Sequence, residues 1–406
     1  MLAQFYAPIV GGEERMTQSL ATALSERGHD VAVATLAHPG LASTEQIDGV
    51  RVHRLPALAA RASRVYSDSG RRHAPPAPDP ETVFALRRVL RREQPDVVHG
   101  HNWLAHAYLP LRRRDRAAYV LSLHDYSLVC ATKRLMYHGQ PCSGPGPLKC
   151  PGCARETYGA IGPAVALMTT LSGRAQRRAA DLLLPVSEAV ARGCGLAAAG
   201  APYEVVPNFR TQAIEPDDAM LPPALPDGPF VLFVGDVSID KGVGILVEAH
   251  ARLQTRVPLV VMGRAVDADL VPLRDDVIDL GLQPYPGVLA AMRRCTVAVV
   301  PSIWPDSFPT VALEAMAAGA AVVVSRIGGL PEQVLDGESG LVVTPGDAGE
   351  LAGALDLLLG DAELRSRLGD GARARVSEFT APAVVPRYEA AYERALAARA
   401  AKLGGR

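Results

Sequence analysis

The sequence has no uncharged apolar run long enough to cross a membrane, and its opening segment, MLAQFYAPIV, includes no Lys or Arg. The first absence argues against a membrane-spanning helix and the second against a secretory leader, so we expect a cytoplasmic protein. Internal repeats and low-complexity tracts are also missing, and 48% hydrophobic with 21% charged residues is ordinary for a globular chain. Disordered and fibrous classes are therefore not expected, and 406 residues are enough for two domains with separate cores.

The net charge is small, at −1, but it is unevenly divided. Residues 1–210 hold 25 Lys and Arg against 17 Asp and Glu, a balance of +8, and the remaining residues hold 17 against 26, a balance of −9. The basic residues include two clusters: Arg87, Arg88, Arg91 and Arg92 on one predicted helix, and Arg112, Arg113, Arg114 and Arg116 after it. Such clusters are most often solvated faces. The alternative is peripheral contact with an anionic inner-membrane face, or with a lipid-linked or phosphorylated acceptor, whereas nucleic acid is not an expected partner.

The chain opens with a predicted strand at 2–7, a turn containing Gly11 and Gly12, a helix at about 13–27 and a strand at 31–35. This order predicts a parallel sheet with the turn at its carboxyl edge. The glycine pair either forms an ordinary tight turn or lets a ligand approach the backbone closely. Further strands are predicted at 50–55, 96–101, 119–125, 181–187 and 203–208. The long connection from 57 to 80 is where we expect acceptor contacts.

Two of these strands end in histidine, at His101 and His124. Side chains just past the carboxyl ends of parallel strands point into the ligand crevice of such folds. A lone histidine is usually a satisfied structural residue, but two strand-end histidines favour a functional role, more so for His124.

Four cysteines follow close together in a Gly/Pro-rich loop: Cys130, Cys142, Cys150 and Cys153. Disulfides are not expected in a cytosolic chain, so a structural tetrahedral Zn²⁺ is one interpretation and a set of reduced, buried thiols is the other. A closed four-thiolate site leaves no open position, so such a metal would be structural and not catalytic.

A second α/β segment begins near Phe230, with a strand to Val234, then DVSIDKG and a helix from Val243. Lys241 precedes that helix, where an ammonium group could neutralise a departing diphosphate; the ordinary alternative is a solvated lysine. The sequence GVG at 242–244 lacks the third glycine of a dinucleotide-binding fingerprint, which argues against a nicotinamide dehydrogenase.

The stretch from Pro301 to Gly329, PSIWPDSFPTVALEAMAAGAAVVVSRIGG, is the most informative part of the chain. Pro309 fits the first turn of a helix and Gly319 its C-terminal stop, and the N–H groups at that N-terminus offer a phosphate site. Glu314 lies one turn inside, among apolar neighbours. An isolated Glu is usually solvated, but a carboxylate in a segment that otherwise reads as buried needs a partner, and a pair of ribose hydroxyls would suit it.

Asp306-x7-Glu314, followed by AMAAG and GG, resembles the donor-binding signature of the retaining family 4 glycosyltransferases, which have the GT-B fold. The resemblance implies an α/β protein with two facing Rossmann-like, doubly wound domains. Three positions depart from the family pattern: Asp306 replaces Glu, Pro309 replaces Gly, and Asp236 replaces an Arg, for which Arg264 is a candidate substitute.

The resemblance also implies domains and roles. We expect an acceptor-side domain at 1–209, a linker at 210–229, a nucleotide-sugar domain at 230–385, and a helix at 386–406 that packs back on the first domain. His124 and Asp306 are the implied catalytic residues. The implied donor-binding residues are Gly11, Gly12, Lys241, Arg264, Ser307, Phe308, Thr310, Val311 and Glu314.

The implied reaction is retaining transfer of a hexose-type sugar from a nucleoside diphosphate donor to an unidentified acceptor, with no cofactor required for catalysis. No assured carboxylate nucleophile is present, so a covalent glycosyl-enzyme is not expected. A sugar-nucleotide epimerase of similar architecture and a non-catalytic nucleotide-sugar-binding protein remain alternatives.

Overall fold

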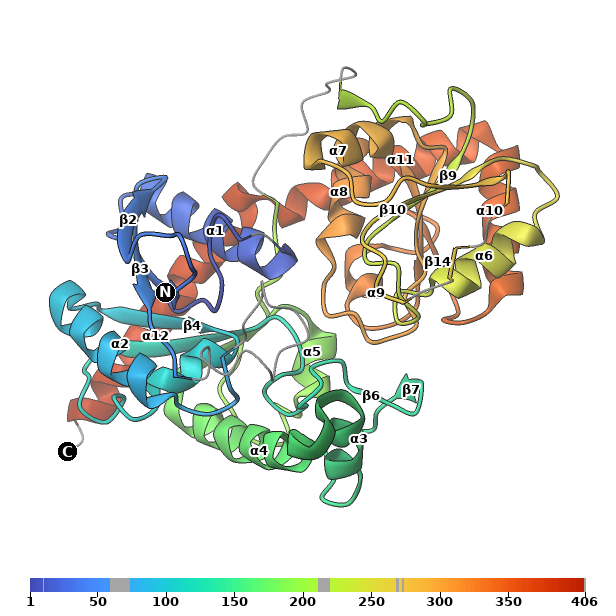
Figure 1. The fold of residues 1–406 in the computed structure, drawn as a ribbon. Helices are drawn as coiled ribbons and strands as arrows, with labels where there is room; N and C mark the ends of the chain where they lie inside the picture. Colours follow the sequence, from blue (N-terminus) through green and yellow to red (C-terminus); the bar gives the residue numbers. More distant parts are fainter. Residues whose placement is uncertain (10, 59–73, 211–219, 268–269, 272–273, 405–406) are drawn as a thin grey trace. The chain divides into compact units, whose positions relative to one another are not determined.

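The computed structural model describes the chain except for residues 10, 59–73, 211–219, 268–269, 272–273 and 405–406. The chain forms two compact units (Figure 1). Unit 1 combines Met1–Asn208 with Ala381–Arg406, and unit 2 is Phe209–Thr380. The expected α/β class with parallel sheets is confirmed in both units.

Unit 1 contains two three-stranded sheets, ordered β1-β3-β2 and β4-β5-β8. Leu2 bridges them, because it pairs with Ala34 of β1 and with Gly100 of β4. Within these two sheets all pairings are parallel except that of β2 with β3. The strands are β1 (Ala32–Leu36), β2 (Thr44–Ile47), β3 (Val50–Leu55), β4 (Val97–His101), β5 (Ala118–Leu123) and β8 (Leu182–Pro185), with a small hairpin of β6 (Met136–Tyr137) and β7 (Gln140–Pro141).

The helices of unit 1 are α1 (Gly12–Glu26), α2 (Pro80–Glu93), α3 (Lys149–Tyr158), α4 (Gly162–Ala179), α5 (Glu188–Gly193) and α12 (Ala381–Gly404). Helix α12 follows unit 2 in sequence but packs against α1 and β5, as its red ribbon beside the blue one shows in Figure 1. Tyr388 and Ala391 are fully buried there. In addition, the Tyr392 hydroxyl lies 2.8 Å from Nδ1 of His99.

Unit 2 is built on a six-stranded, all-parallel sheet ordered β11-β10-β9-β12-β13-β14. Its strands are β9 (Val231–Val234), β10 (Leu259–Met262), β11 (Val277–Asp279), β12 (Val297–Val300), β13 (Ala321–Ser325) and β14 (Leu341–Val343). Its helices are α6 (Val243–Ala251), α7 (Tyr285–Arg294), α8 (Thr310–Ala318), α9 (Leu330–Gln333), α10 (Ala348–Gly360) and α11 (Ala362–Val376). In chain order the strands run 3-2-1-4-5-6, which is the doubly wound order of dinucleotide-binding folds.

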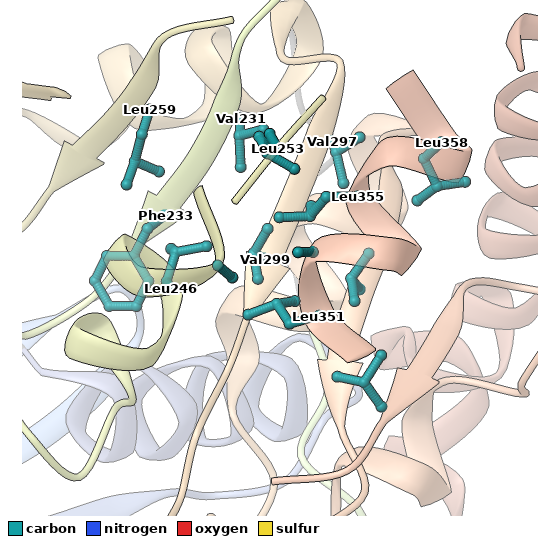
Figure 2. Close-up of a cluster of buried hydrophobic side chains, with 14 of the residues drawn as sticks. Val231, Phe233, Leu246, Leu253, Leu259, Val297, Val299, Leu351, Leu355 and Leu358 are labelled. Atoms are coloured by element: carbon teal, nitrogen blue, oxygen red, sulfur yellow. The ribbon is translucent and has the colours of Figure 1, made fainter. Parts of the chain in front are cut away.

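The core of unit 2 explains why its central strands are almost wholly apolar. Figure 2 shows Val231 and Phe233 of β9 packed with Leu246 of α6 and Leu355 of α10. All four side chains are at most 1% exposed. Strands covered on both faces cannot alternate polar with apolar residues, so the VAVV and AVVVS runs are the expected pattern.

Several expected boundaries differ from the structure. The first strand, expected at 2–7, keeps regular pairing only at Leu2. The strand expected at 203–208 is reduced to one bridge from Tyr203 to Leu183. The N–H groups of Glu204 and Val206 still donate to the Leu183 and Pro185 carbonyls, at 3.0 and 3.1 Å, but Pro185 of β8 has no N–H to donate in return, so the ladder stops there. The long connection expected to contact the acceptor lies mostly outside the described residues, at 59–73.

The domain limits also differ. The region expected to be a linker, 210–229, belongs to unit 2 where it is described: the Met220 carbonyl lies against Gly287, and Leu225 is buried. The C-terminal helix starts at Ala381, ahead of the expected position, and Pro386 falls within its first turns. Among the described residues, no helix is both long and apolar enough to cross a membrane.

Candidate active site

The strand order of unit 2 reverses between β9 and β12, and the loops that leave these strands meet at the carboxyl edge of the sheet. The Ile303 N–H donates to the Asp240 carbonyl at 2.9 Å. Gly242 has φ +74°, and a Cβ there would lie 1.9 Å from the Pro301 carbonyl oxygen. Only glycine permits this approach. Ligands of doubly wound sheets bind at this reversal point.

Lys241 and Asp306 face each other across these two loops. The Lys241 Nζ lies 2.5 Å from Oδ2 of Asp306, and the Ser302 hydroxyl donates to the same oxygen at 3.4 Å. The Asp306 carboxylate is buried, whereas 27% of the Lys241 side chain is exposed. The ammonium group also lies 5.3 Å from the Trp304 ring centroid. Lys241 is therefore an anchored cation with one side open to solvent, not a freely solvated lysine.

The backbone of Asp306 is fixed by the GG sequence that follows β13. The Gly329 N–H donates to the Asp306 carbonyl at 2.7 Å. Gly328 has φ +59°, and a Cβ there would lie 2.0 Å from the same oxygen. The structure therefore requires glycine at 328, although this residue lies a whole helix and strand beyond Asp306 in the sequence.

Helix α8 begins directly beyond the Asp306 loop. Its N-cap is Pro309, which has no side-chain oxygen to accept from the first-turn N–H groups. Thr310 and Val311 therefore open the helix with amide groups that the cap residue does not satisfy, as a phosphate site requires. Phe308 is buried and packs edge-to-face on Phe379, with ring centroids 5.4 Å apart, and Ser307 beside it is half-buried.

Glu314 is 8% exposed, so it is not a solvated helix residue. The Tyr285 hydroxyl donates to its Oε1 at 3.1 Å. Tyr285 begins α7, where Pro286 fits the first helical turn. Arg210 is close to both residues: burial lowers the pKa of its guanidinium, and the charges of Tyr285 and Glu314 partly offset this. Arg210 could not be identified from the sequence, because its strand-like contact with Thr380, which draws it into unit 2, joins residues far apart in the chain.

Arg264 and Asp236 form an ion pair with each other. The Arg264 Nη2 lies 3.1 Å from Oδ2 of Asp236, and both side chains are about half exposed. They are brought together because Gly235 and Gly263 end neighbouring strands, and a Cβ on Gly263 would lie 1.7 Å from the Gly235 carbonyl oxygen. Asp236, which stands where the family often has Arg, thus forms an ion pair with Arg264, the residue that we expected to substitute for that missing arginine.

Unit 1 has a corresponding arrangement at its own sheet edge. Gly11 is the N-cap of α1 with an extended φ of −152°, and a Cβ on Gly12 would meet no atom within 4 Å. Neither the backbone angle at Gly11 nor the space around Gly12 requires a glycine, so the structure gives no support for an ordinary tight turn as the reason for this pair. The next residue, Glu13, accepts from Nδ2 of Asn102 at 2.7 Å. Burial, reinforced by Asp125, raises the pKa of Glu13 to about 8, so this carboxyl is largely protonated at neutral pH. Glu13 was not among the residues predicted from the sequence, although an acid directly after two glycines at a helix start was an available signal.

The strand-end histidines lie together. Nδ1 of His101 is 2.9 Å from Nε2 of His124, and their rings stack with centroids 5.2 Å apart. Burial lowers the pKa of His124 to about 4 and that of His101 well below its usual range. The pair is therefore neutral at physiological pH, with one ring N–H shared between the two nitrogens.

The four cysteines expected to bind zinc line a single cavity of about 30 Å³. All four are free thiols. The pKa of the Cys153 thiol is raised, mainly by burial and then by the charges of Cys130, Glu156, Cys150 and Cys142. The four sulfur atoms therefore lie close to one another. Within the part of the chain that the structure describes, no three His, Cys, Asp or Glu side chains stand in ligating geometry.

Two family models match this chain. "Glycosyl transferase 4-like domain" matches residues 11–208, and "Glycosyl transferases group 1" matches residues 222–375. These ranges follow the two structural units closely. The chain belongs to the family 4 glycosyltransferases of the GT-B type.

Curated relatives agree at family level. The chain is 37% identical over 219 residues to a D-inositol 3-phosphate glycosyltransferase of Acidothermus cellulolyticus, a match that covers 48% of each chain. It thus spans about half the length of that relative. It is 28% identical over 401 residues to a glycogen synthase of Mycobacterium tuberculosis, covering 93% of this chain and 89% of the relative.

Solved structures show the same fold. A sucrose-phosphate synthase from Thermosynechococcus elongatus superposes with a TM-score of 0.73 at 22% identity, covering 96% of this chain and 94% of that one. The Anabaena protein HepE, solved in complex with UDP, gives a TM-score of 0.67 at 19% identity, covering 97% and 98%. HepE has also been solved with UDP-glucose.

Proposed function

We propose that this protein is a retaining glycosyltransferase that moves a hexose-type sugar from a nucleoside diphosphate donor to an acceptor hydroxyl. The observation that carries the proposal is the grouping in unit 2 of Lys241, Asp306 and the N-terminus of α8 at the point of strand reversal, with Glu314 one helical turn away. UDP and UDP-glucose bound to HepE, a protein of the same fold, add support for a nucleoside diphosphate-sugar as donor.

Each group suits a part of that donor. A diphosphate leaving group gains negative charge as it departs, and the Lys241 ammonium with the N–H groups of Thr310 and Val311 would stabilise it. The Glu314 carboxylate would accept from the two ribose hydroxyls, with Tyr285 fixing its orientation. Asp306 would orient the hydroxyls of the donor sugar, and Ser307 and Phe308 would line the same loop.

The proposed mechanism uses no covalent enzyme intermediate. The bond from the anomeric carbon to the diphosphate breaks, the acceptor oxygen attacks on the same face, and the acceptor proton leaves with the diphosphate. His124 and the turn at Gly11 and Gly12 are proposed to contact the donor sugar. His124 would act as a neutral hydrogen-bonding group, consistent with its lowered pKa. Because the chain supplies its own cationic and N–H groups, we propose no cofactor for catalysis.

The acceptor is proposed only by class. Arg87, Arg88, Arg91 and Arg92 are exposed along α2, which favours an anionic acceptor or a peripheral anionic membrane surface. Arg112 does not belong to this basic face: it is buried, and its Nη2 lies 2.5 Å from Asp181. One observation favours the non-catalytic alternative. Asp236 stands where the family often has Arg, and its carboxylate forms an ion pair with Arg264, the arginine that could have supplied the missing positive charge.

Thermal unfolding with a panel of UDP-, GDP-, ADP- and dTDP-sugars tests the proposal, alongside donor hydrolysis and transfer. A donor at about 100 times its dissociation constant should stabilise the native protein by about 2.7 kcal/mol. Glu314→Gln should lose most of that gain, and the exposed Glu338→Gln is the matched control that should keep it. A folded wild type that no donor stabilises would overturn the donor site. Stabilisation without hydrolysis or transfer would instead support a binding protein, and a changed sugar on an intact nucleotide would support an epimerase.

A further inference from the structure

The cysteine-rich segment that follows β5 has little regular structure of its own. Between Leu123 and Lys149 it contains only the two-residue strands β6 and β7. Lys133 and Leu135 nevertheless hold left-handed backbone conformations, with φ of +65° and +53°. Such conformations are strained for residues other than glycine and persist only where the surroundings fix them. The segment therefore requires a constraint beyond its few ladder hydrogen bonds.

The four thiols lie at the points where this segment folds on itself. Cys150 and Cys153 stand at positions i and i+3 in the first turn of α3, so they share one helix face. Cys142 directly follows β7, and its N–H donates to the Leu135 carbonyl at 2.7 Å. Cys130 ends a turn in which its N–H donates to the Tyr126 carbonyl at 2.8 Å. One ligand from the turn before the β6–β7 hairpin, one from directly after the hairpin and two from a helix start would join these separate parts.

Two of the four sulfurs, those of Cys150 and Cys130, have surroundings that suit thiolate ligands, whereas the Cys142 thiol donates to the Gly144 carbonyl at 3.4 Å. The Gly146 N–H points at Cys150 Sγ at 3.2 Å, and the Thr132 hydroxyl lies 3.3 Å from Cys130 Sγ. Donors of this kind around sulfur orient and stabilise bound thiolates. The Cys153 thiol lies 3.8 Å from the Met136 carbonyl, which brings the α3 side of the cavity against β6.

We propose that Cys130, Cys142, Cys150 and Cys153 bind one structural Zn²⁺ in the cavity that they line. The cavity, at about 30 Å³, is of a size for a single ion. The sulfurs are not in ligating geometry in the described part of the chain. Zinc binding therefore requires the sulfurs to move closer together, and rotation about χ1, the one side-chain torsion that moves a cysteine sulfur, is the adjustment that we propose. Tetrahedral coordination by four thiolates closes the site to substrate.

The metal would also fix charges at the sheet edge of unit 1. The same segment carries Asp125 and Lys133, which respectively raise and lower the pKa of Glu13. The Lys133 Nζ lies 4.4 Å from the Trp103 ring centroid, and Trp103 donates to the Ser127 carbonyl at 3.2 Å. A segment held by zinc would thus keep the Lys133 ammonium near Glu13, and the Asp125 carboxylate near both Glu13 and His124.

The test measures zinc in the full-length protein purified under reducing conditions without chelator. We expect about one Zn²⁺ per chain, released in step with thiol modification by a mercurial reagent. Replacement by Co²⁺ should give the absorption typical of tetrahedral thiolate coordination. Cys150→Ser with Cys153→Ser should lower the zinc content at least tenfold. The control variant, Cys295→Ser, lies in unit 2 outside the cluster and should keep the full content.

Two measurements on the wild type make the result independent of whether the double variant folds. Strong chelation should increase tryptic cleavage at Lys133, Arg134 and Lys149, while the rest of the chain stays resistant. Six titratable thiols with no bound zinc would overturn the proposal in favour of free thiols. A mass lower by two or four hydrogens, with fewer titratable thiols, would overturn it in favour of disulfides.

Discussion

The contact between Lys241 and Asp306 predicts a measurable coupling between two loops that are far apart in sequence. Replacing Lys241 with Met keeps the length of the side chain but leaves a buried carboxylate without its cation. Exposed ion pairs contribute about 0–1 kcal/mol, whereas breaking a fully buried pair costs about 3–5 kcal/mol. Asp306 is buried, but 27% of the Lys241 side chain is exposed. We therefore expect an intermediate coupling energy of about 2 kcal/mol.

The two tryptophans make this coupling easy to isolate. Trp103 lies in unit 1 and Trp304 in unit 2, so a Trp103→Phe background leaves a fluorophore only in unit 2. Urea unfolding of Lys241→Met, Asp306→Asn and the double variant in this background gives the double-mutant cycle. Circular dichroism provides a second probe of unfolding. It is needed because Lys241 lies close to the Trp304 ring, so replacing Lys241 can itself change the fluorescence of Trp304. A coupling energy below about 0.5 kcal/mol would show that the pair acts as a screened surface contact and refute the reasoning.

Three further predictions concern other parts of the site. Gly328→Ala should destabilise unit 2 by more than about 2 kcal/mol, because its Cβ would meet the Asp306 backbone; Gly337→Ala, also at positive φ but with free space, should cost only about 1 kcal/mol. Equal losses in urea unfolding would contradict this. Tyr285→Phe removes a hydrogen bond to Glu314 and should weaken donor binding about fivefold in calorimetry; unchanged affinity would show that Tyr285 does not position the carboxylate. Because the pKa of Glu13 is raised from 4.5 to about 8, the folded state binds an extra proton in this interval, and this group's contribution to stability falls as pH rises. Glu13→Gln should therefore gain about 3 kcal/mol relative to wild type between about pH 5 and about pH 8. The exposed Glu26→Gln should show no such trend, and a flat difference for Glu13→Gln would refute the assignment.

The parts that could be predicted from sequence depend on short-range signals. Apolar runs such as VAVV predict buried parallel strands, and the α8 helix has a proline before it and a glycine after it. The burial of Glu314 was inferred from its apolar neighbours, which is again a local property. The family resemblance rested on spacings within the single stretch 301–329, and the family models confirm it.

The parts that were missed depend on contacts between distant residues. Arg210 lies near Glu314 because its backbone pairs with Thr380, at the other end of unit 2 in sequence. Glu13 is perturbed by Asn102 and Asp125, which come from two other strand ends. Arg112 looked like part of a basic surface, but a buried Asp181 holds it inside. No local sequence pattern could show these three contacts, because each joins residues that are far apart in the chain and meet only once the unit has folded.

The return of α12 to unit 1 has a consequence for how the protein folds during translation. Unit 2 is continuous in sequence from Phe209 to Thr380 and can reach its native contacts as soon as it leaves the ribosome. Unit 1 must wait, because Tyr388 and Ala391 fill its core and Tyr392 completes the hydrogen bonding of His99. A chain truncated after Thr380 and released from the ribosome should therefore contain a finished second unit and an unfinished first one, and chaperones that bind apolar surface should favour residues 1–208.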